Sequence, residues 1–238
     1  MTTRRTRKRI LRLFCLGMGL VVMHACGSLV LVHAQDEPEL SKEEGRQAEA
    51  QAHRMAAEDF YDHGKVDEAI TQWREALRLD PGMAKAHHDL GLALRDKGQL
   101  AESISELREA VRLEANNALA YADLGDALQE RGDHAGALAA YRTAVSLVPN
   151  SAPLHGNLGY LLVQKGDLDG AIAEWREATR LDPQYAPPYA NLGEALEGKG
   201  DPQGAITAYE QFLKLAPKAP NAAEVRTRLS ALKGTAAK

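Results

Sequence analysis

The sequence predicts an all-α protein built from stacked helical hairpins, and three observations carry this prediction. Runs rich in Val, Ile, Thr and Tyr, which are typical of strands, are missing after residue 35. Hydrophobic residues make up 45% of the chain but aromatic residues only 5%, so the core must be assembled from small side chains that pack closely. Glycine, alanine and proline also recur with a period of 34 residues, which is long enough for one helical hairpin.

The first 34 residues have the order of a secretory signal. Six basic residues and no acidic residue occur here, an uncharged apolar stretch follows the basic head, and the segment ends at Ala34 in a sequence that resembles a small-residue cleavage site. We expect cleavage after Ala34 and export of the remainder, to the periplasm or envelope of a bacterium. Both cysteines, Cys15 and Cys26, lie in this segment, so the remainder has neither a disulfide nor a thiol nucleophile.

Two alternatives to a cleaved signal remain open. Residues 13–35 carry no charge and are long enough to cross a bilayer, so the segment can stay as a membrane anchor. The letters MHAC, ending at Cys26, loosely resemble a bacterial lipoprotein box, although large residues precede the cysteine. Both alternatives also place residues 35–238 outside the cytoplasm, because the basic head stays on the cytoplasmic side.

The remainder contains five copies of one sequence unit. Inner glycines, turn glycines, small residues and large apolar residues each recur with the 34-residue period. The inner glycines are Gly91, Gly125, Gly159 and Gly193; the turn glycines are Gly64, Gly98, Gly132, Gly166 and Gly200; the small residues are Ala69, Ser103, Ala137, Ala171 and Ala205; and the large residues are Trp73, Leu107, Tyr141, Trp175 and Tyr209. Proline closes four of the five copies, at Pro81, Pro149, Pro183 and Pro217.

This period and these residues resemble the tetratricopeptide repeat (TPR) family. The resemblance covers five repeats, at residues 50–83, 84–117, 118–151, 152–185 and 186–219. It implies a right-handed α-solenoid of helix-turn-helix hairpins with a C-terminal capping helix. The first copy is degenerate, because Ala57 stands where the other four copies have the inner glycine.

The fourth copy shows why each unit is expected to fold as a hairpin. Gly166 is expected to end the first helix as a left-handed cap, and Asp167 is expected to cap the second. Gly159 lies inside the first helix, where glycine costs roughly 1 kcal/mol relative to alanine. We expect packing to offset this cost, because Gly159 and Ala171 let the two helices approach closely beside Trp175. One hairpin cannot bury its apolar face alone, so the copies should stack into a continuous core.

Two segments flank the repeats. Residues 35–49 combine an acidic linker with the start of the first helix, which should begin near Lys42 because Ser41 and Glu44 have capping-box spacing. Residues 220–233 place apolar residues on one face and predict a capping helix, and residues 234–238 predict a frayed tail.

No set of residues indicates catalysis, a metal site or a cofactor. Three histidines share one repeat position with two tyrosines, so we interpret them as packing residues rather than metal ligands. These residues are His53, His87, Tyr121, His155 and Tyr189. Neither a phosphate-binding glycine loop nor a serine nucleophile motif occurs. The remainder is acidic, which argues against nucleic acid. We therefore expect no enzyme, no cofactor and no small-molecule substrate.

The TPR resemblance implies that the first helices line a concave groove that binds extended peptides or partner helices. Three repeat positions on successive turns of the first helices should face this groove. The first position carries Asp89, Asp123, Asn157 and Asn191, and the second carries Leu92, Asp126, Tyr160 and Glu194. The third position carries Arg95, Gln129, Val163 and Glu197. We predict that peptide contacts come from Asp89, Asp123, Asn157, Asn191, Asp126, Tyr160, Glu194 and Arg95. Asparagine amides in such a row can hold a peptide backbone through a paired donor and acceptor; the alternative is that they only solvate the helices.

The groove chemistry narrows the expected partner. The family's carboxylate clamp for chaperone tails needs a lysine or arginine at a position that here carries His88, Ala122, Gly156 and Ala190, so a chaperone-tail adaptor is not expected. The acids Asp123, Asp126, Glu194 and Glu197 favour a neutral or basic segment. The sequence thus predicts an exported scaffold that binds a protein or peptide. The alternative is a structural or assembly subunit of a cell-envelope complex, held by stacking or convex-face contacts; membrane attachment through residues 1–34 and an oligomeric state both remain open.

Overall fold

The computed structural model describes residues 41–236, which belong to one unit of the chain. The segment predicted to direct export, residues 1–34, lies outside the described residues, as does the acidic linker up to residue 40. The predicted all-α class is confirmed, since residues 41–236 form eleven helices and no strand. None of these helices combines the length and the apolar character that crossing a bilayer requires.

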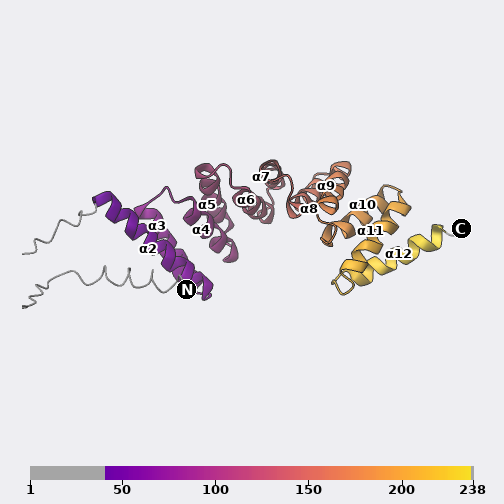
Figure 1. The fold of residues 1–238 in the computed structure, drawn as a ribbon, viewed down its shortest axis with the longest axis horizontal. Helices are drawn as coiled ribbons and strands as arrows, with labels where there is room; N and C mark the ends of the chain where they lie inside the picture. Colours follow the sequence, from indigo (N-terminus) through magenta and orange to yellow (C-terminus); the bar gives the residue numbers. More distant parts are fainter. Residues whose placement is uncertain (1–40, 237–238) are drawn as a thin grey trace, which may run out of the picture. The chain divides into compact units, whose positions relative to one another are not determined.

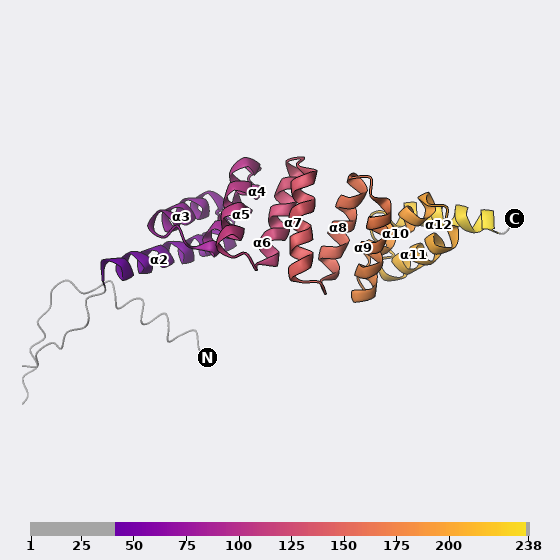
Figure 2. The same cartoon turned by 90° about the horizontal axis from the view of Figure 1, so that it is seen from above.

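Ten of the helices form five antiparallel hairpins in chain order, which can be followed in Figures 1 and 2. The first helices of the hairpins are α2 (Lys42–Asp62), α4 (Ala84–Asp96), α6 (Ala118–Glu130), α8 (Ala152–Gln164) and α10 (Pro187–Gly198). The second helices are α3 (Val66–Leu79), α5 (Leu100–Leu113), α7 (His134–Leu147), α9 (Leu168–Leu181) and α11 (Pro202–Leu215). Each second helix packs against its own first helix, and α3, α5, α7 and α9 also pack against the first helix of the next hairpin, which stacks the units.

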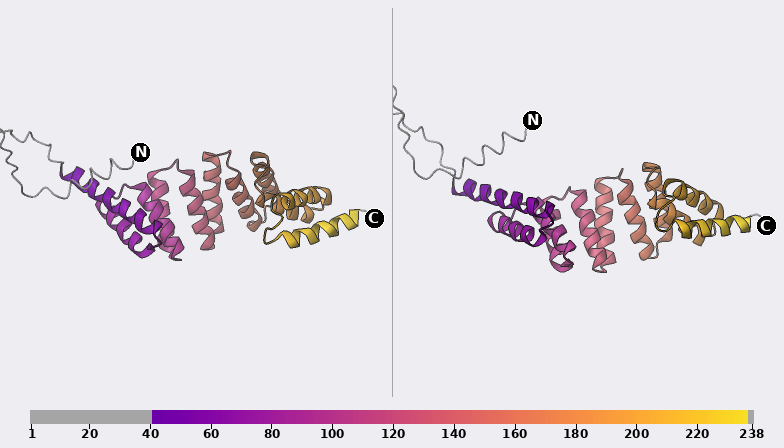
Figure 3. Two further views of the ribbon diagram at one scale, coloured as in Figure 1. Left: turned by 60° about the horizontal axis from the view of Figure 1, so that its bottom comes forward. Right: turned by 90° about the horizontal axis from the view of Figure 1, so that it is seen from below.

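The eleventh helix, α12 (Ala222–Ala236), has no hairpin partner and packs against α11 (Figure 3). The sequence predicted this helix over residues 220–233, whereas the helix begins at Ala222 and continues to Ala236. Gly234, predicted as the start of a frayed tail, therefore lies inside the helix. The alanines and threonine that follow it tolerate helical backbone, and one glycine near a helix end costs only about 1 kcal/mol.

The turn and cap signals of the sequence act as predicted. Gly166 has φ of 83°, a left-handed conformation that favours glycine, at the end of α8. The Asp167 carboxylate then accepts a hydrogen bond from the backbone N–H of Gly170 at 2.9 Å and caps α9. Ser41 and Glu44 form a reciprocal capping box, so α2 begins at Lys42.

The glycine inside α8 is explained by the closeness of α9. A Cβ atom on Gly159 would lie 2.5 Å from Nε1 of Trp175. Trp175 and Ala171 are buried, and the indole N–H of Trp175 donates to the backbone oxygen of Gly156 at 3.0 Å. Packing and one hydrogen bond thus offset the helix penalty of Gly159. The buried apolar residues form two clusters, one within α2–α4 and the other spread from α5 to α12.

Candidate functional site

We call the side of the first helices that carries the predicted groove positions the first-helix face; on α4 these positions are Asp89, Leu92 and Arg95. Side chains of neighbouring repeats contact one another across it. His88 of α4 contacts Asp123 of α6 at 2.6 Å, and Arg95 of α4 lies 3.6 Å from Asp126 of α6. The 34-residue period therefore brings near-equivalent positions of α4 and α6 together.

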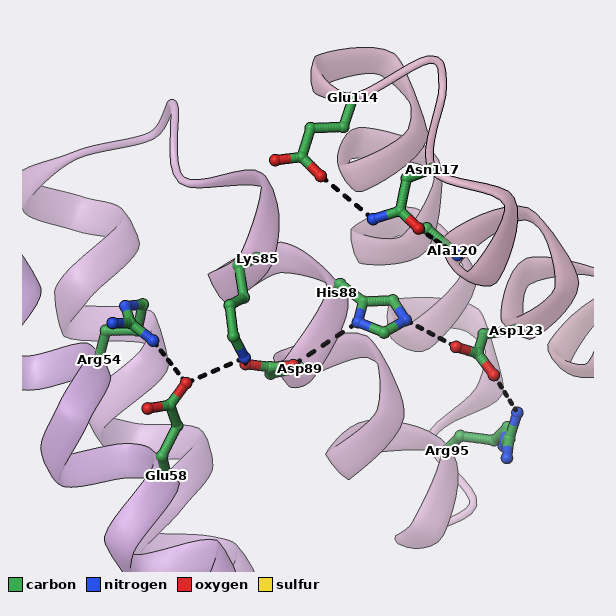
Figure 4. Close-up of polar contacts among 10 residues, drawn as sticks. All are labelled: Arg54, Glu58, Lys85, His88, Asp89, Arg95, Glu114, Asn117, Ala120 and Asp123. Atoms are coloured by element: carbon green, nitrogen blue, oxygen red, sulfur yellow. Dashed lines mark hydrogen bonds and ion pairs between the residues drawn. The ribbon is translucent and has the colours of Figure 1, made fainter. Parts of the chain in front are cut away.

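A row of charged side chains begins on α2 and crosses to α4 (Figure 4). The Glu58 carboxylate of α2 pairs with Arg54 at 2.5 Å and with the ammonium group of Lys85 of α4 at 3.0 Å. Lys85 also contacts Asp89, one turn further along α4, at 2.6 Å. A single lysine thus links two carboxylates from different repeats.

His88 continues this row from α4 to α6. Its Nε2 atom lies 2.6 Å from the Asp123 carboxylate, and its Nδ1 atom lies 3.6 Å from that of Asp89. The hydrogen bond with Asp123, helped by that with Asp89, raises the pKa of His88 to about 9 against the opposing effect of burial. His88 is therefore a cation at neutral pH. Burial acts to raise the pKa of Asp89, but the hydrogen bonds from His88 and Lys85 together lower it.

Arg95 lies among three carboxylates of α6. Its guanidinium nitrogens are 3.6 Å from Asp126, 3.7 Å from Glu130 and 4.0 Å from Asp123. The Asp126 carboxylate also accepts a hydrogen bond from the Tyr141 hydroxyl. Burial raises the pKa of Asp126 despite this hydrogen bond and the charge of Arg95. Arg95 therefore faces the acids of the next repeat rather than open solvent alone.

The two glutamates of α10 have a basic partner on the capping helix. The guanidinium group of Arg228 lies 3.3 Å from Glu194 and 3.3 Å from Glu197, and Glu197 accepts a further hydrogen bond from the Tyr209 hydroxyl at 2.9 Å. Together with the pairing of Asp123 and Asp126, these contacts correct one expectation. The acids of the groove do not form an uncompensated negative lining, because each has a cationic partner within the chain.

The predicted asparagine row differs between its two members. The side-chain amide of Asn157 donates one N–H to the Tyr141 hydroxyl at 2.9 Å, so its carbonyl oxygen and its second N–H are left for a ligand. Asn191 is half-buried, and its side-chain amide has no hydrogen-bond partner in the part of the chain from 41 to 236. Their role in holding a peptide backbone stays a prediction.

Large apolar side chains on the surface concentrate on the first-helix face. Of the six that are exposed among the described residues, four lie on first helices, three of these at groove positions of the repeat and Leu119 one turn before Asp123, and two follow one another at the end of α7. The four are Met55, Leu119, Tyr160 and Val163, and the two are Leu147 and Val148. Leu119 is 64% exposed and Tyr160 is 49% exposed, so these side chains have no cover of their own.

The shared histidine position proves to be a structural contact. The Nδ1 atoms of His53, His87 and His155 each lie 2.6–2.7 Å from a side chain 19 residues later on the second helix of the same hairpin. His87 and His155 also contact the carbonyl oxygens of the prolines that close the preceding copies. No group of three potential metal ligands occurs within residues 41–236. The hydrogen bonds of His53, His87 and His155 tie the two helices of their own hairpins together.

The first repeat contains a pocket that the sequence reasoning missed. It lies between α2 and α4, has a volume of about 300 Å³, and is lined by Glu58, Tyr61, Asp62, Trp73, Lys85, Asp89 and Leu92. Glu58, Tyr61, Asp89 and Leu92 occupy groove positions of the first two copies, whereas Asp62 directly follows Tyr61 and Lys85 lies one turn before Asp89. The register of the repeat identified those positions in principle, but the degenerate first copy was left out of the predicted groove.

The tryptophan of this pocket differs from its counterpart three repeats later. The Trp73 side chain is 2% exposed, and its Nε1 atom has no hydrogen-bond partner among the residues described, whereas that of Trp175 donates to Gly156. Ala57 occupies the position of Gly159, and a Cβ there leaves no room for the indole orientation of Trp175. A buried N–H without an acceptor costs about 1–3 kcal/mol.

Comparisons with known proteins agree with the repeat pattern. A TPR repeat family model matches residues 125–165 and 159–200, and tetratricopeptide repeat models match residues 54–118 and 186–219. A search of curated proteins found no match to this chain.

Several solved structures share the fold. A crystal structure of MamA is 25% identical, with a TM-score of 0.67 over 73% of this chain and 94% of that chain. YrrB, described as a TPR protein with an unusual peptide-binding site, is 23% identical, with a TM-score of 0.67 over 78% of this chain and 95% of its own. PilF of Pseudomonas aeruginosa is 20% identical, with a TM-score of 0.63 over 79% of this chain and 90% of its own.

These matches extend over nearly all of the described hairpins, and they agree with the inner glycines, turn glycines and buried aromatic residues that the structure places at equivalent positions. The family is one of scaffolds for protein–protein interaction and is typically non-enzymatic. This chain belongs to the tetratricopeptide repeat family and carries several repeats in tandem.

Proposed function

We propose that this protein is an exported scaffold whose first-helix face binds an extended segment of a partner protein. The observation that carries the proposal is the concentration of exposed apolar side chains on that face, which includes Leu119, Tyr160 and Val163. Uncovered apolar surface of this kind marks sites of interaction with other proteins. YrrB, which shares the fold, is described as having a peptide-binding site, and this supports the same use of the fold here.

Helix α8 is the centre of the proposed surface. Its groove positions carry no charged residue, and they combine the exposed Tyr160 and Val163 with Asn157. The groove positions of α6 and α10 on either side carry acids that are paired within the chain. A partner segment can therefore place apolar side chains on Tyr160 and Val163 without removing an unpaired charge from water.

The test compares two double variants with matched chemistry. Tyr160→Ser with Val163→Ser removes exposed apolar surface from α8, and Leu147→Ser with Val148→Ser removes exposed apolar surface from the end of α7. Proteins are captured from membrane and soluble extracts with the wild type and with both variants. We expect the α8 variant alone to lose the partner that the wild type retains.

The opposite result would change the function assigned to this chain. If the α8 variant keeps the partner and the α7 variant loses it, the chain is an assembly subunit of an envelope complex that uses its convex side. All four substituted side chains are exposed and outside the core, so both variants should keep the helical fold. Circular dichroism of each variant checks this.

Export is the second part of the proposal and rests on the sequence of residues 1–34. The basic head, the uncharged apolar stretch and Ala34 support it. Residues 1–40 fused to a reporter that is active only outside the cytoplasm should give a signal, and a silent reporter would refute export. The mass of the mature N-terminus then distinguishes cleavage before Gln35, lipidation at Cys26 and an uncleaved anchor.

A further inference from the structure

The pocket of the first repeat has an acidic lining with one carboxylate left unpaired. Glu58, Asp62 and Asp89 contribute three carboxylates and Lys85 one ammonium group. Lys85 contacts both Glu58 and Asp89, whereas Asp62 is exposed and has no hydrogen bond or ion pair with any residue from 41 to 236. An anion entering this pocket would meet net negative charge, so the lining favours a cation.

The remaining walls of the pocket suit an apolar stem below that cation. Tyr61 and Trp73 place their rings 5.6 Å apart at an angle of 57°, and Leu92 of α4 lines the same space. The Tyr61 hydroxyl already donates to Asp96 at 2.5 Å, so the ring, rather than the hydroxyl, is the group that Tyr61 offers a ligand. Aromatic rings attract cationic groups and also pack against methylene chains.

The indole N–H of Trp73 adds an independent sign that the pocket is incomplete. It is buried without an acceptor, although the equivalent N–H of Trp175 has one. The indole ring lines the pocket with its N–H covered, so a local shift of Trp73 on binding would bring this donor to a carbonyl oxygen of a peptide segment. The pocket thus combines groups for a cation, for an alkyl stem and for a backbone carbonyl.

We propose that this pocket receives a lysine or arginine side chain of the partner segment, with the stem against Tyr61, Trp73 and Leu92 and the cationic head beside Asp62. This inference rests on the proposed function and adds to it the identity of one recognised residue. The basic residue of the partner would then bind at α2–α4, whereas the apolar surface of α8 belongs to the fourth repeat.

The two tryptophans of the chain allow a direct test by nuclear magnetic resonance. Each indole N–H gives one signal, assigned with Trp73→Phe and Trp175→Phe. The full chain is titrated with N-acetyl-arginine amide and N-acetyl-lysine amide, and with N-acetyl-citrulline amide as the uncharged counterpart of arginine. We expect the basic probes to move the Trp73 signal in a saturable manner and to leave the Trp175 signal in place. The citrulline probe should bind more weakly.

A matched pair of variants tests the role of Asp62. Asp62→Asn removes the unpaired carboxylate and should weaken the basic probes about two- to fivefold, the range of an exposed ion pair. Glu68→Gln removes an exposed carboxylate of α3 outside the pocket and should change nothing. Neither carboxylate has a partner within the described unit, so both variants keep the ion pairs of the fold.

Two results would overturn the inference. One is equal binding of citrulline and arginine probes, and the other is an Asp62→Asn variant that binds the basic probes as tightly as the wild type does. Neither result bears on the apolar surface of α8. Loss of the captured partner in the Tyr160→Ser and Val163→Ser variant would still support the proposed function, so the two failures are distinguishable.

Discussion

His88 of α4 and Asp123 of α6 contact each other at 2.6 Å although 35 residues separate them. Tyr61 of α2 and Asp96 of α4 have the same separation and form a hydrogen bond of 2.5 Å. One repeat plus one residue is therefore a recurring offset for polar contacts between first helices. These contacts tie neighbouring repeats together on the first-helix face.

The His88 contact should make stability depend on pH. The neighbouring carboxylates raise the pKa of His88 from 6.5 to about 9, so the folded state holds this proton more tightly than the unfolded chain does. The contribution is therefore complete below about pH 6.5 and is lost as the pH rises through about 9. We expect His88→Gln to reduce the drop in unfolding free energy between pH 6.5 and 9.5 by on the order of 2–3 kcal/mol, measured by urea titration.

The matched control for this experiment is His134→Gln. His134 is exposed at the start of α7 and has no ion pair with any of the residues described. This variant should follow the pH profile of the wild type. If His88→Gln also follows that profile, the contact with Asp123 does not hold the His88 proton in solution.

The close approach of α8 and α9 predicts two large losses of stability. Trp175→Ala deletes a side chain that is 4% exposed and should cost about 3–5 kcal/mol. Gly159→Leu forces a branched side chain into a space where even a Cβ lies 2.5 Å from the indole, and should cost about 1–3 kcal/mol or more. Thermal melting followed by circular dichroism measures both. Unchanged curves for the two variants would contradict the register of the hairpin.

Substitution of phenylalanine for Trp73 and for Trp175 should reduce the free energy of unfolding by different amounts. Trp175→Phe loses a hydrogen bond to the Gly156 carbonyl, whereas Trp73→Phe removes an N–H that has no acceptor within residues 41–236. Both variants lose similar apolar volume, so the difference reflects the hydrogen bond. We expect Trp175→Phe to be more destabilising by about 1 kcal/mol in urea titrations. An equal or larger cost for Trp73→Phe would show that its N–H is satisfied in solution.

The hairpins and their caps were predictable from the sequence because they depend on local rules. Gly166, Asp167 and Trp175 act within one repeat, where helix period, capping and close packing determine their roles. The same signals recur at the same positions in the other copies, so the assignment of each hairpin does not depend on a single match. The end of α12 has no such local signal, because one glycine near a helix end costs only about 1 kcal/mol and the helix continues through Gly234 to Ala236.

For the first-helix face, the sequence predicted which positions line the groove but not which side chains pair with one another. The sequence identified Asp89, Asp123 and Arg95 as groove residues, but their partners depend on the lateral offset between neighbouring first helices. That offset is a result of stacking and has no local signature. The sequence alone therefore leaves Asp123, Asp126, Glu194 and Glu197 as free negative charge, although His88, Arg95 and Arg228 compensate them in the structure.

The paired state of these acids leads to a prediction about salt. Exposed charges are screened over about 8–10 Å at physiological ionic strength, so binding through free acids would weaken steeply as salt is added. Asp123, Asp126, Glu194 and Glu197 are instead paired within the chain, and the α8 groove positions are uncharged. We expect the affinity for a captured partner to change less than about threefold between low and physiological salt, measured by isothermal titration.

The asparagines should then contribute more than the acids. Asn191 has a free amide among the described residues and Asn157 a free carbonyl oxygen, and each can bind a peptide backbone. Asn157→Ala and Asn191→Ala should each cost on the order of 1 kcal/mol, so the double variant should bind about tenfold or more weakly at both salt concentrations. If the double variant binds as tightly as the wild type at both, the partner does not use the amide row. Combined with retention of the partner by the α8 variant, that result would remove the peptide-groove interpretation and leave the assembly subunit in its place.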